Sequence, residues 1–104
     1  MQIQSRLCQV HEMAAKAYEQ VYIADLPAYY ADLVHHYNQA NCQNEERYYA
    51  RLAGEQAAAR FAHEDAIRFF DRAVALVSEA DVDEHYHLLA AREQVHDVVG
   101  DRQR

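Results

Sequence analysis

Apolar residues recur at intervals of three and four along the first part of the chain, which is the spacing of one helix face. The positions between them are mostly charged or amide-bearing, so we predict one long amphipathic helix over residues 3–22. Pro27 opens the next helix, because proline lacks a backbone donor but fits a first helical turn. Its cap is then Asp25 or Leu26, of which Asp25 is the better chemical choice. The apolar face of the first helix consists of Ile3, Leu7, Val10, Ala14, Tyr18 and Val21.

The same periodicity predicts four more helices, joined by turns short enough to favour antiparallel packing. The fold class is therefore all-α, with about five antiparallel helices in a single domain. The fifth helix is expected to pack through Tyr86, Leu89, Glu93, His96 and Val99. The predicted parts are an N-terminal helix at 1–24, helical hairpins at 27–60 and 63–99, and a frayed tail at 100–104.

Residues with special backbone or capping preferences mark the predicted helix ends. Asn41 can take the left-handed conformation that closes a helix, and Asn44 is the expected cap of the third. Asp81 and Glu84 have the spacing of a capping box, in which Glu84 reaches back to the start of the fifth helix. Gly100 is its expected C-cap.

Small residues line one face of the third predicted helix, and they let a neighbouring helix approach closely. The fourth helix supplies Ala66 and Phe70, an A-x3-F spacing in which the aromatic ring fills the gap. This is the second half of the tetratricopeptide (TPR) pattern, W-x2-L-G-x2-Y followed by A-x3-F, so we predict a TPR-like α–α superhelix. Alanine replaces the Trp and Tyr of the first half, and the pattern does not recur as a regular tandem array. The small residues are Ala50, Ala53, Gly54 and Ala57.

Two segments carry a more specific resemblance, residues 33–41 (LVHHYNQAN) and residues 49–57 (YARLAGEQA). Together with the helix-Pro-helix entry, they resemble the TPR-like helical region that follows the ATPase module in large bacterial signalling proteins. Those proteins include predicted ATPases coupled to adenylate/guanylate cyclase or transcription-regulator domains. The resemblance covers roughly residues 7–102 and implies a scaffold and sensor arm without an active site.

No phosphate loop of the G-x-x-x-x-G-K-[ST] type occurs in the chain, so any ATPase would lie on another chain or upstream of Met1. The resemblance also implies a further helix after Gly100 and Asp101, which makes the chain either an excised piece or a small stand-alone relative. We accordingly predict a non-enzymatic protein–protein interaction or scaffold module, part of a larger bacterial signalling or regulatory assembly.

The formal net charge of −7 disfavours nucleic acid and anionic membrane surfaces as partners, because both bind basic patches. No apolar run approaches the ~18 residues of a membrane span, and the N-terminus lacks the apolar core of a signal peptide. Cys8 and Cys42 form neither a disulfide framework nor a zinc motif. Cys8 and His11 have the spacing of a nucleophile and its base, but no motif orients the histidine. We therefore expect a cytoplasmic protein with reduced cysteines.

Seven histidines are many for this length, yet their spacing does not predict a metal site. His85 and His87 are two residues apart and point to different sides of a helix, and the adjacent His35 and His36 do so as well. No H-E-x-x-H motif is present. The sequence thus predicts no catalytic residues, no metal ion and no cofactor.

Two tyrosine pairs, Tyr29-Tyr30 and Tyr48-Tyr49, can each turn only one ring toward the core, since neighbours lie ~100° apart around a helix. Tyr30 and Tyr49 fit the inner stripe. Tyr29 and Tyr48 then either serve a contact surface or pack under a neighbouring helix.

A TPR-like stack presents the first helix of each pair on its concave wall. By pattern position, the predicted binding surface consists of His35, Asn38, Gln39, Arg51 and Glu55. The expected partner is an unidentified protein, and self-association through the fifth helix would give a homodimer. An alternative of another class stays open: a small helical domain that senses a ligand or metal ion through histidines and tyrosines between its helices.

Overall fold

The chain is almost entirely helical in the computed structural model, which describes residues 2–103 and the side chains of residues 6–97. No strand occurs among the described residues, so the predicted all-α class is confirmed. None of the described helices is long and apolar enough to cross a lipid bilayer. The described elements are α1 Gln2–Val21, the 3-10 helix η1 Ile23–Tyr29, α2 Tyr30–Gln39, α3 Gln43–Ala59, α4 His63–Leu76 and α5 Val82–Gln103.

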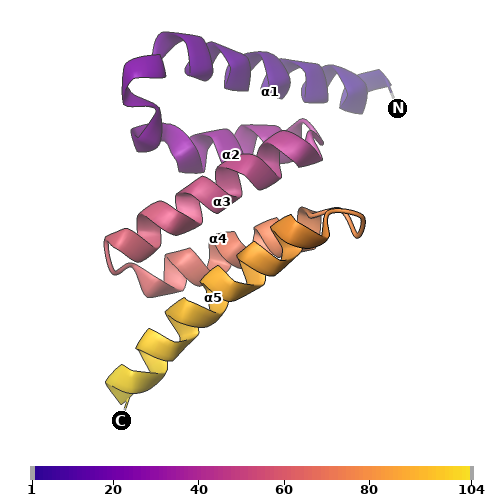
Figure 1. The fold of residues 1–104 in the computed structure, drawn as a ribbon. Coiled ribbons are helices and arrows are strands. Elements are labelled where there is room, and N and C mark those ends of the chain that lie inside the picture. Colours follow the sequence, from indigo (N-terminus) through magenta and orange to yellow (C-terminus); the bar gives the residue numbers. More distant parts are fainter. Residues whose placement is uncertain (1, 104) are drawn as a thin grey trace.

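The helices stack one on the next in chain order, so that α1 and α5 lie at opposite ends of the molecule (Figure 1). Successive helices run in opposite directions, and α3 packs against both α2 and α4. The radius of gyration is 14.9 Å, slightly above the roughly 13 Å of a compact domain of this length. The stack is therefore somewhat elongated, with α3 at its centre.

One cluster of buried side chains lies where α1, α2 and α3 meet. It contains the aromatic rings of Tyr37 and Tyr49, which stack with an interplanar angle of 5°, and the smaller Ala15 and Leu33. The hydroxyl of Tyr37 donates to the carboxylate of Glu19 on α1, so this buried phenol has a hydrogen-bonding partner. Burial raises the pKa of Tyr37 above its usual value, and the Glu19 carboxylate adds to the shift.

A second cluster lies between α3, α4 and α5 and is mostly alanine around the ring of Phe70. The approach of α3 and α4 is so close that a Cβ added at Gly54 would lie 2.8 Å from two ring carbons of Phe70. The small-residue stripe therefore packs as its spacing predicts. The buried members are Ala50, Ala57, Ala66, Phe70, Ala73, Leu88 and Val95.

The predicted packing face of α1 is wrong by about one position. Ala15 is fully buried, while Leu7 and Val10 are 55% and 60% exposed. The reason is that aromatic side chains position the helix: the ring of Tyr18 packs against Tyr29 and His36, and that contact turns the aliphatic stripe outward.

The predicted face of α5 is also wrong. Leu88 and Val95 are buried, whereas Tyr86 is 69% exposed and Leu89 lies near the surface. Apolar residues occur on both sides of this helix, so periodicity alone could not select the side that meets α4. The side chain of Val99 lies outside the described residues, and Gly100 is not a C-cap, since α5 continues through it to Gln103.

Helix ends follow the predicted turn chemistry only in part. Asn41 is left-handed, with a φ of 58°, as predicted, and Phe61 adopts a similar φ of 63° that the sequence did not suggest. Asn44 is not a cap, because α3 begins at Gln43 after Cys42. The helix predicted from residue 27 starts as α2 at Tyr30, after a 3-10 segment kinked at Asp25.

The outer tyrosines of the two pairs differ in environment. The ring of Tyr48 is 51% exposed, so it lies on the surface. The ring of Tyr29 is half-buried and stacks on Tyr22, with ring centroids 4.1 Å apart, so it packs under the α1–η1 junction.

Candidate functional site

The five residues of the predicted binding surface do not line one common cavity. His35 and Asn38 line a groove between α2 and α4, while Arg51 and Glu55 line a cavity between α3 and α5. Glu46 of α3 faces the first groove, and nine residues separate it from Glu55. At roughly 100° per residue, the two glutamates point to opposite sides of α3. The structure thus divides the predicted surface between two faces of the stack.

The α2–α4 groove, as we call it, has a volume of about 460 Å³. Val34 and Phe69 in its lining are partly buried and Ala31 is exposed, and its polar residues include two arginines and a histidine. The groove therefore offers apolar contact together with hydrogen-bond donors. Its lining residues are Ala31, Val34, His35, Asn38, Glu46, Arg68, Phe69 and Arg72.

A buried carboxylate holds the floor of this groove together. Glu46 is only 2% exposed, and it accepts hydrogen bonds from Arg72 Nε at 2.6 Å and Arg72 Nη2 at 3.2 Å. Asn38 Nδ2 donates to the same carboxylate at 3.2 Å. A buried charge needs such partners, because removing it from water is costly. The hydrogen bond to Glu46 also raises the pKa of Arg72. Because Asn38, Glu46 and Arg72 belong to three different helices, these bonds join α2, α3 and α4 at one point.

Arg68 lies at the edge of the groove with most of its side chain in solvent. Its guanidinium is 5.4 Å from the ring centroid of Phe69 and 3.2 Å from Asp65. The exposed guanidinium is therefore available to a second acidic group, since a surface ion pair of this kind is weak. Gln39, the remaining predicted residue, donates to Asn38 at 3.2 Å on the side facing α1.

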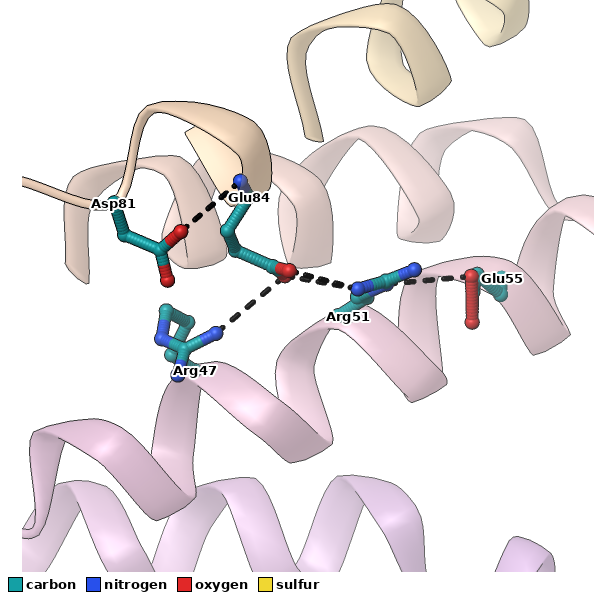
Figure 2. A network of polar contacts seen from close by, with 5 residues as sticks. All are labelled: Arg47, Arg51, Glu55, Asp81 and Glu84. Carbon is teal, nitrogen blue, oxygen red and sulfur yellow. Dashed lines mark hydrogen bonds and ion pairs between the residues drawn. The ribbon is translucent and has the colours of Figure 1, made fainter. Parts of the chain in front are cut away.

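Arg51 and Glu55, the other part of the predicted binding surface, belong to a network of charges between α3 and α5 (Figure 2). The Glu84 carboxylate accepts from Arg51 Nη1 at 2.8 and 3.1 Å and lies 3.4 Å from Arg47. Arg51 Nε also lies 3.5 Å from Glu55. Burial alone would lower the pKa of Arg51, but the charges of Glu84 and Glu55 outweigh it and leave the pKa raised. These charges satisfy one another, which favours a structural role.

This network also corrects the predicted capping box. Asp81 caps α5 as predicted, since its Oδ1 accepts the backbone N–H of Glu84 at 3.2 Å. The side chain of Glu84 does not reach back to the helix start, because it is held by Arg47 and Arg51. Figure 2 shows both halves of the arrangement.

Three histidines gather between α1 and α2, a grouping whose members the spacing of histidines within single helices could not identify. His11 Nδ1 and His36 Nδ1 are 3.1 Å apart, and the ring of His35 is 5.5 Å from that of His36. Burial lowers the pKa of His36, and the neighbouring His35 and His11 lower it further. Within the described chain, no group of three or more His, Cys, Asp or Glu side chains could hold a metal ion.

The two cysteines each contact a group on a neighbouring element of the stack. Cys42 Sγ contacts Glu12 at 3.3 Å, and burial with this contact raises the pKa of the thiol to about 11. Cys8 Sγ lies 3.5 Å from the carbonyl oxygen of Gln39, while His11 is directed to His36. The arrangement therefore does not pair Cys8 with a base.

His63 lies at the start of α4 beside Glu64 and Asp65, and the sequence explains these acids by the helix dipole without predicting a site there. Both of its ring nitrogens are buried and have no hydrogen-bonding partner among the described residues. His63 also lines a cavity of about 370 Å³ that is separate from the α2–α4 groove.

Comparison with known proteins adds no assignment. No protein-family model matches the chain, and no curated protein or solved structure matches it significantly.

Proposed function

We propose that the chain is a non-enzymatic scaffold module of TPR type that binds a protein partner in the α2–α4 groove, within a larger bacterial signalling or regulatory assembly. The groove carries the proposal. It combines partly buried apolar side chains with the exposed guanidinium of Arg68 and the imidazole of His35. Such a mixture is what a peptide segment with an apolar and an acidic side chain requires.

The construction of the groove supports this function. Its floor is fixed by the bonds from Arg72 and Asn38 to the buried Glu46, so its walls are held in place before a partner arrives. A preformed surface loses little conformational freedom on binding, which favours affinity. The side chain of Phe69 adds an aromatic contact beside the Arg68 cation, and aromatic and arginine side chains are enriched at protein interfaces.

The test is affinity capture with three versions of the chain, followed by titration of the purified candidate partner. Arg68→Glu reverses a charge in the groove without touching the Glu46 contacts. Arg60→Glu makes the same change on an exposed side chain of the α3–α4 turn and is the matched control. We expect Arg68→Glu to weaken binding roughly tenfold or more, and Arg60→Glu to leave it unchanged.

Two results would contradict the proposal. One is a specific partner that binds Arg68→Glu and Arg60→Glu equally well. The other is a partner whose capture survives a bulky block of the groove, for which Ala31→Trp is suitable because Ala31 is exposed on the groove wall. Circular dichroism of each variant verifies that the helices remain formed.

A second function, sensing of a divalent metal ion, has one observation in its favour. The 3.1 Å between His11 Nδ1 and His36 Nδ1 is close to the roughly 3.3 Å that separates two imidazole nitrogens bound to one tetrahedral zinc ion at about 2.0–2.1 Å. Zinc titration followed by the melting temperature tests it. A rise in melting temperature with zinc that is lost in His36→Gln supports metal sensing, and a melting temperature that does not change with zinc excludes it.

A further inference from the structure

His63 holds an unusual position at the turn between α3 and α4. It is the first residue of α4, two residues after the left-handed Phe61. Both ring nitrogens are shielded from solvent, and neither has a hydrogen-bonding partner among the described residues. Burying polar atoms without partners is unfavourable, and most buried polar side chains in proteins have at least one partner. Rotation of the side chain toward the cavity beside it would give one of these nitrogens a partner.

The space beside the ring is a defined cavity, the His63 cavity, of about 370 Å³. Most of its lining is apolar, with the buried Phe70 and Val95 as its deepest members. Glu55 and Gln94 also line the cavity but are exposed, so they belong to its mouth. The complete lining is Glu55, Ala58, Phe61, His63, Phe70, Ala91, Gln94 and Val95.

The lining limits the chemistry of an occupant. A volume of about 370 Å³ lies near the lower end of the range for small-molecule sites, roughly 300–1,000 Å³. Phe70 and Phe61 favour an aromatic ring, because offset and edge contacts between rings are stabilising. The carboxylate of Glu55 at the mouth and the acidic chain disfavour an anion. A neutral imidazole has one N–H donor and one acceptor nitrogen, and the acceptor pairs with a polar hydrogen on the occupant.

We propose that the His63 cavity binds a small neutral aromatic molecule carrying one polar hydrogen, of the indole or phenol class, which donates a hydrogen bond to the ring of His63. This site is distinct from the α2–α4 groove and adds a ligand-binding activity to the scaffold function. Water is the competing occupant, since Glu55, His63 and Gln94 give the mostly apolar cavity polar groups with which ordered water molecules could bond.

Indole and 1-methylindole are the probes, because they share one shape and differ in the N–H. Each is titrated into the ¹⁵N-labelled full chain, and amide shifts are recorded in two-dimensional NMR spectra. We expect saturable shifts at Phe61, His63 and Val95 with indole. The affinity for 1-methylindole should be about fivefold weaker, the equivalent of one neutral hydrogen bond.

His63→Phe keeps an aromatic ring and removes the acceptor, so it should bring indole down to the affinity of 1-methylindole. His87→Phe, an exposed histidine on α5 outside the cavity lining, is the matched control and should leave both affinities unchanged. The comparison of the two probes on the unchanged protein needs no variant, so a failure of His63→Phe to fold does not remove the test.

Three outcomes would overturn the assignment. Absence of saturable shifts up to the solubility of indole would mean that the cavity holds water only. Equal affinities for the two probes would mean that His63 does not accept a hydrogen bond from the ligand. Tighter binding of an Ala-Trp-Ala peptide than of free indole would make the cavity a pocket for a side chain of a protein partner instead of a small-molecule site. None of these results depends on the α2–α4 groove, so the scaffold function is tested separately.

Discussion

Gly54→Ala has two opposing effects on stability at the contact of α3 with α4, a gain in helix propensity and a loss from overpacking. Alanine in place of glycine stabilises a helix interior by about 1 kcal/mol. The added Cβ would, however, lie 2.8 Å from two ring carbons of Phe70 and 3.1 Å from a third. Phe70 is almost completely buried and cannot move outward, so we take about 2 kcal/mol for the overpacking. We therefore expect Gly54→Ala to destabilise the protein by about 1 kcal/mol and to lower the melting temperature by about 5 °C.

Urea unfolding followed by circular dichroism at 222 nm measures this change. Phe70→Ala is the matched background, because truncation to Cβ removes all three ring carbons that the Cβ added at Gly54 would meet. In that background the helix propensity alone remains, and Gly54→Ala should stabilise by about 1 kcal/mol. The coupling between the two positions is then about 2 kcal/mol. Stabilisation by Gly54→Ala in the unmodified protein, or additivity of the two changes, would refute the close-approach argument.

Three further changes test the polar contacts. Glu46→Ala leaves the guanidinium of Arg72 without its buried partner, and because Arg72 is itself 44% exposed we expect a loss of about 2 kcal/mol in urea unfolding; a loss below about 0.5 kcal/mol would contradict this. The lowered pKa of His36 means that the unfolded chain binds more protons than the folded one as the pH falls below about 6.5, so His36→Gln should reduce the stability lost between pH 7.5 and 5.5; an unchanged pH slope would be evidence against it. Asp81→Ala removes the cap of α5 and should cost about 1 kcal/mol in thermal unfolding, whereas Asp81→Asn should retain most of it.

The parts of the fold that the sequence predicted are those in which local and tertiary preferences agree. The alanines of α3 and the A-x3-F spacing of Ala66 and Phe70 require a close helix pair, and the two helices meet in that way. Asn41 was recognised because few residues other than glycine take the left-handed conformation readily. Asp81 was recognised because its carboxylate acts on a backbone N–H only three residues away.

The parts of the fold that the sequence did not predict depend on which neighbouring element each helix packs against. Periodicity gives the faces of α1 and α5 but not the choice among them, and in both helices contacts with neighbouring elements decided the orientation. The approach of His11 to His36 joins residues 25 positions apart, so no pattern within one helix contains it. The division of the predicted binding surface has the same origin, since residues on successive helices can face opposite sides of the stack.

The contacts around α4 and the contacts of α1 with α2 are of different kinds, and this difference bears on the proposed function. Around α4, the Glu46–Arg72 pair holds the α2–α4 groove, and the ring of Phe70 packs α4 against α3. At α1, much of the contact with α2 comes from rings that include His11 and His36, and burial, together with the neighbouring His35 and His11, lowers the pKa of His36. Mild acidification should therefore loosen the contact of α1 with α2. Because His35 lies both in the histidine cluster and in the lining of the α2–α4 groove, the change would reach that edge of the groove. The contacts of Glu46 with Arg72 and Asn38 would still hold the floor of the groove, so a bound partner would lose contact at the His35 edge alone.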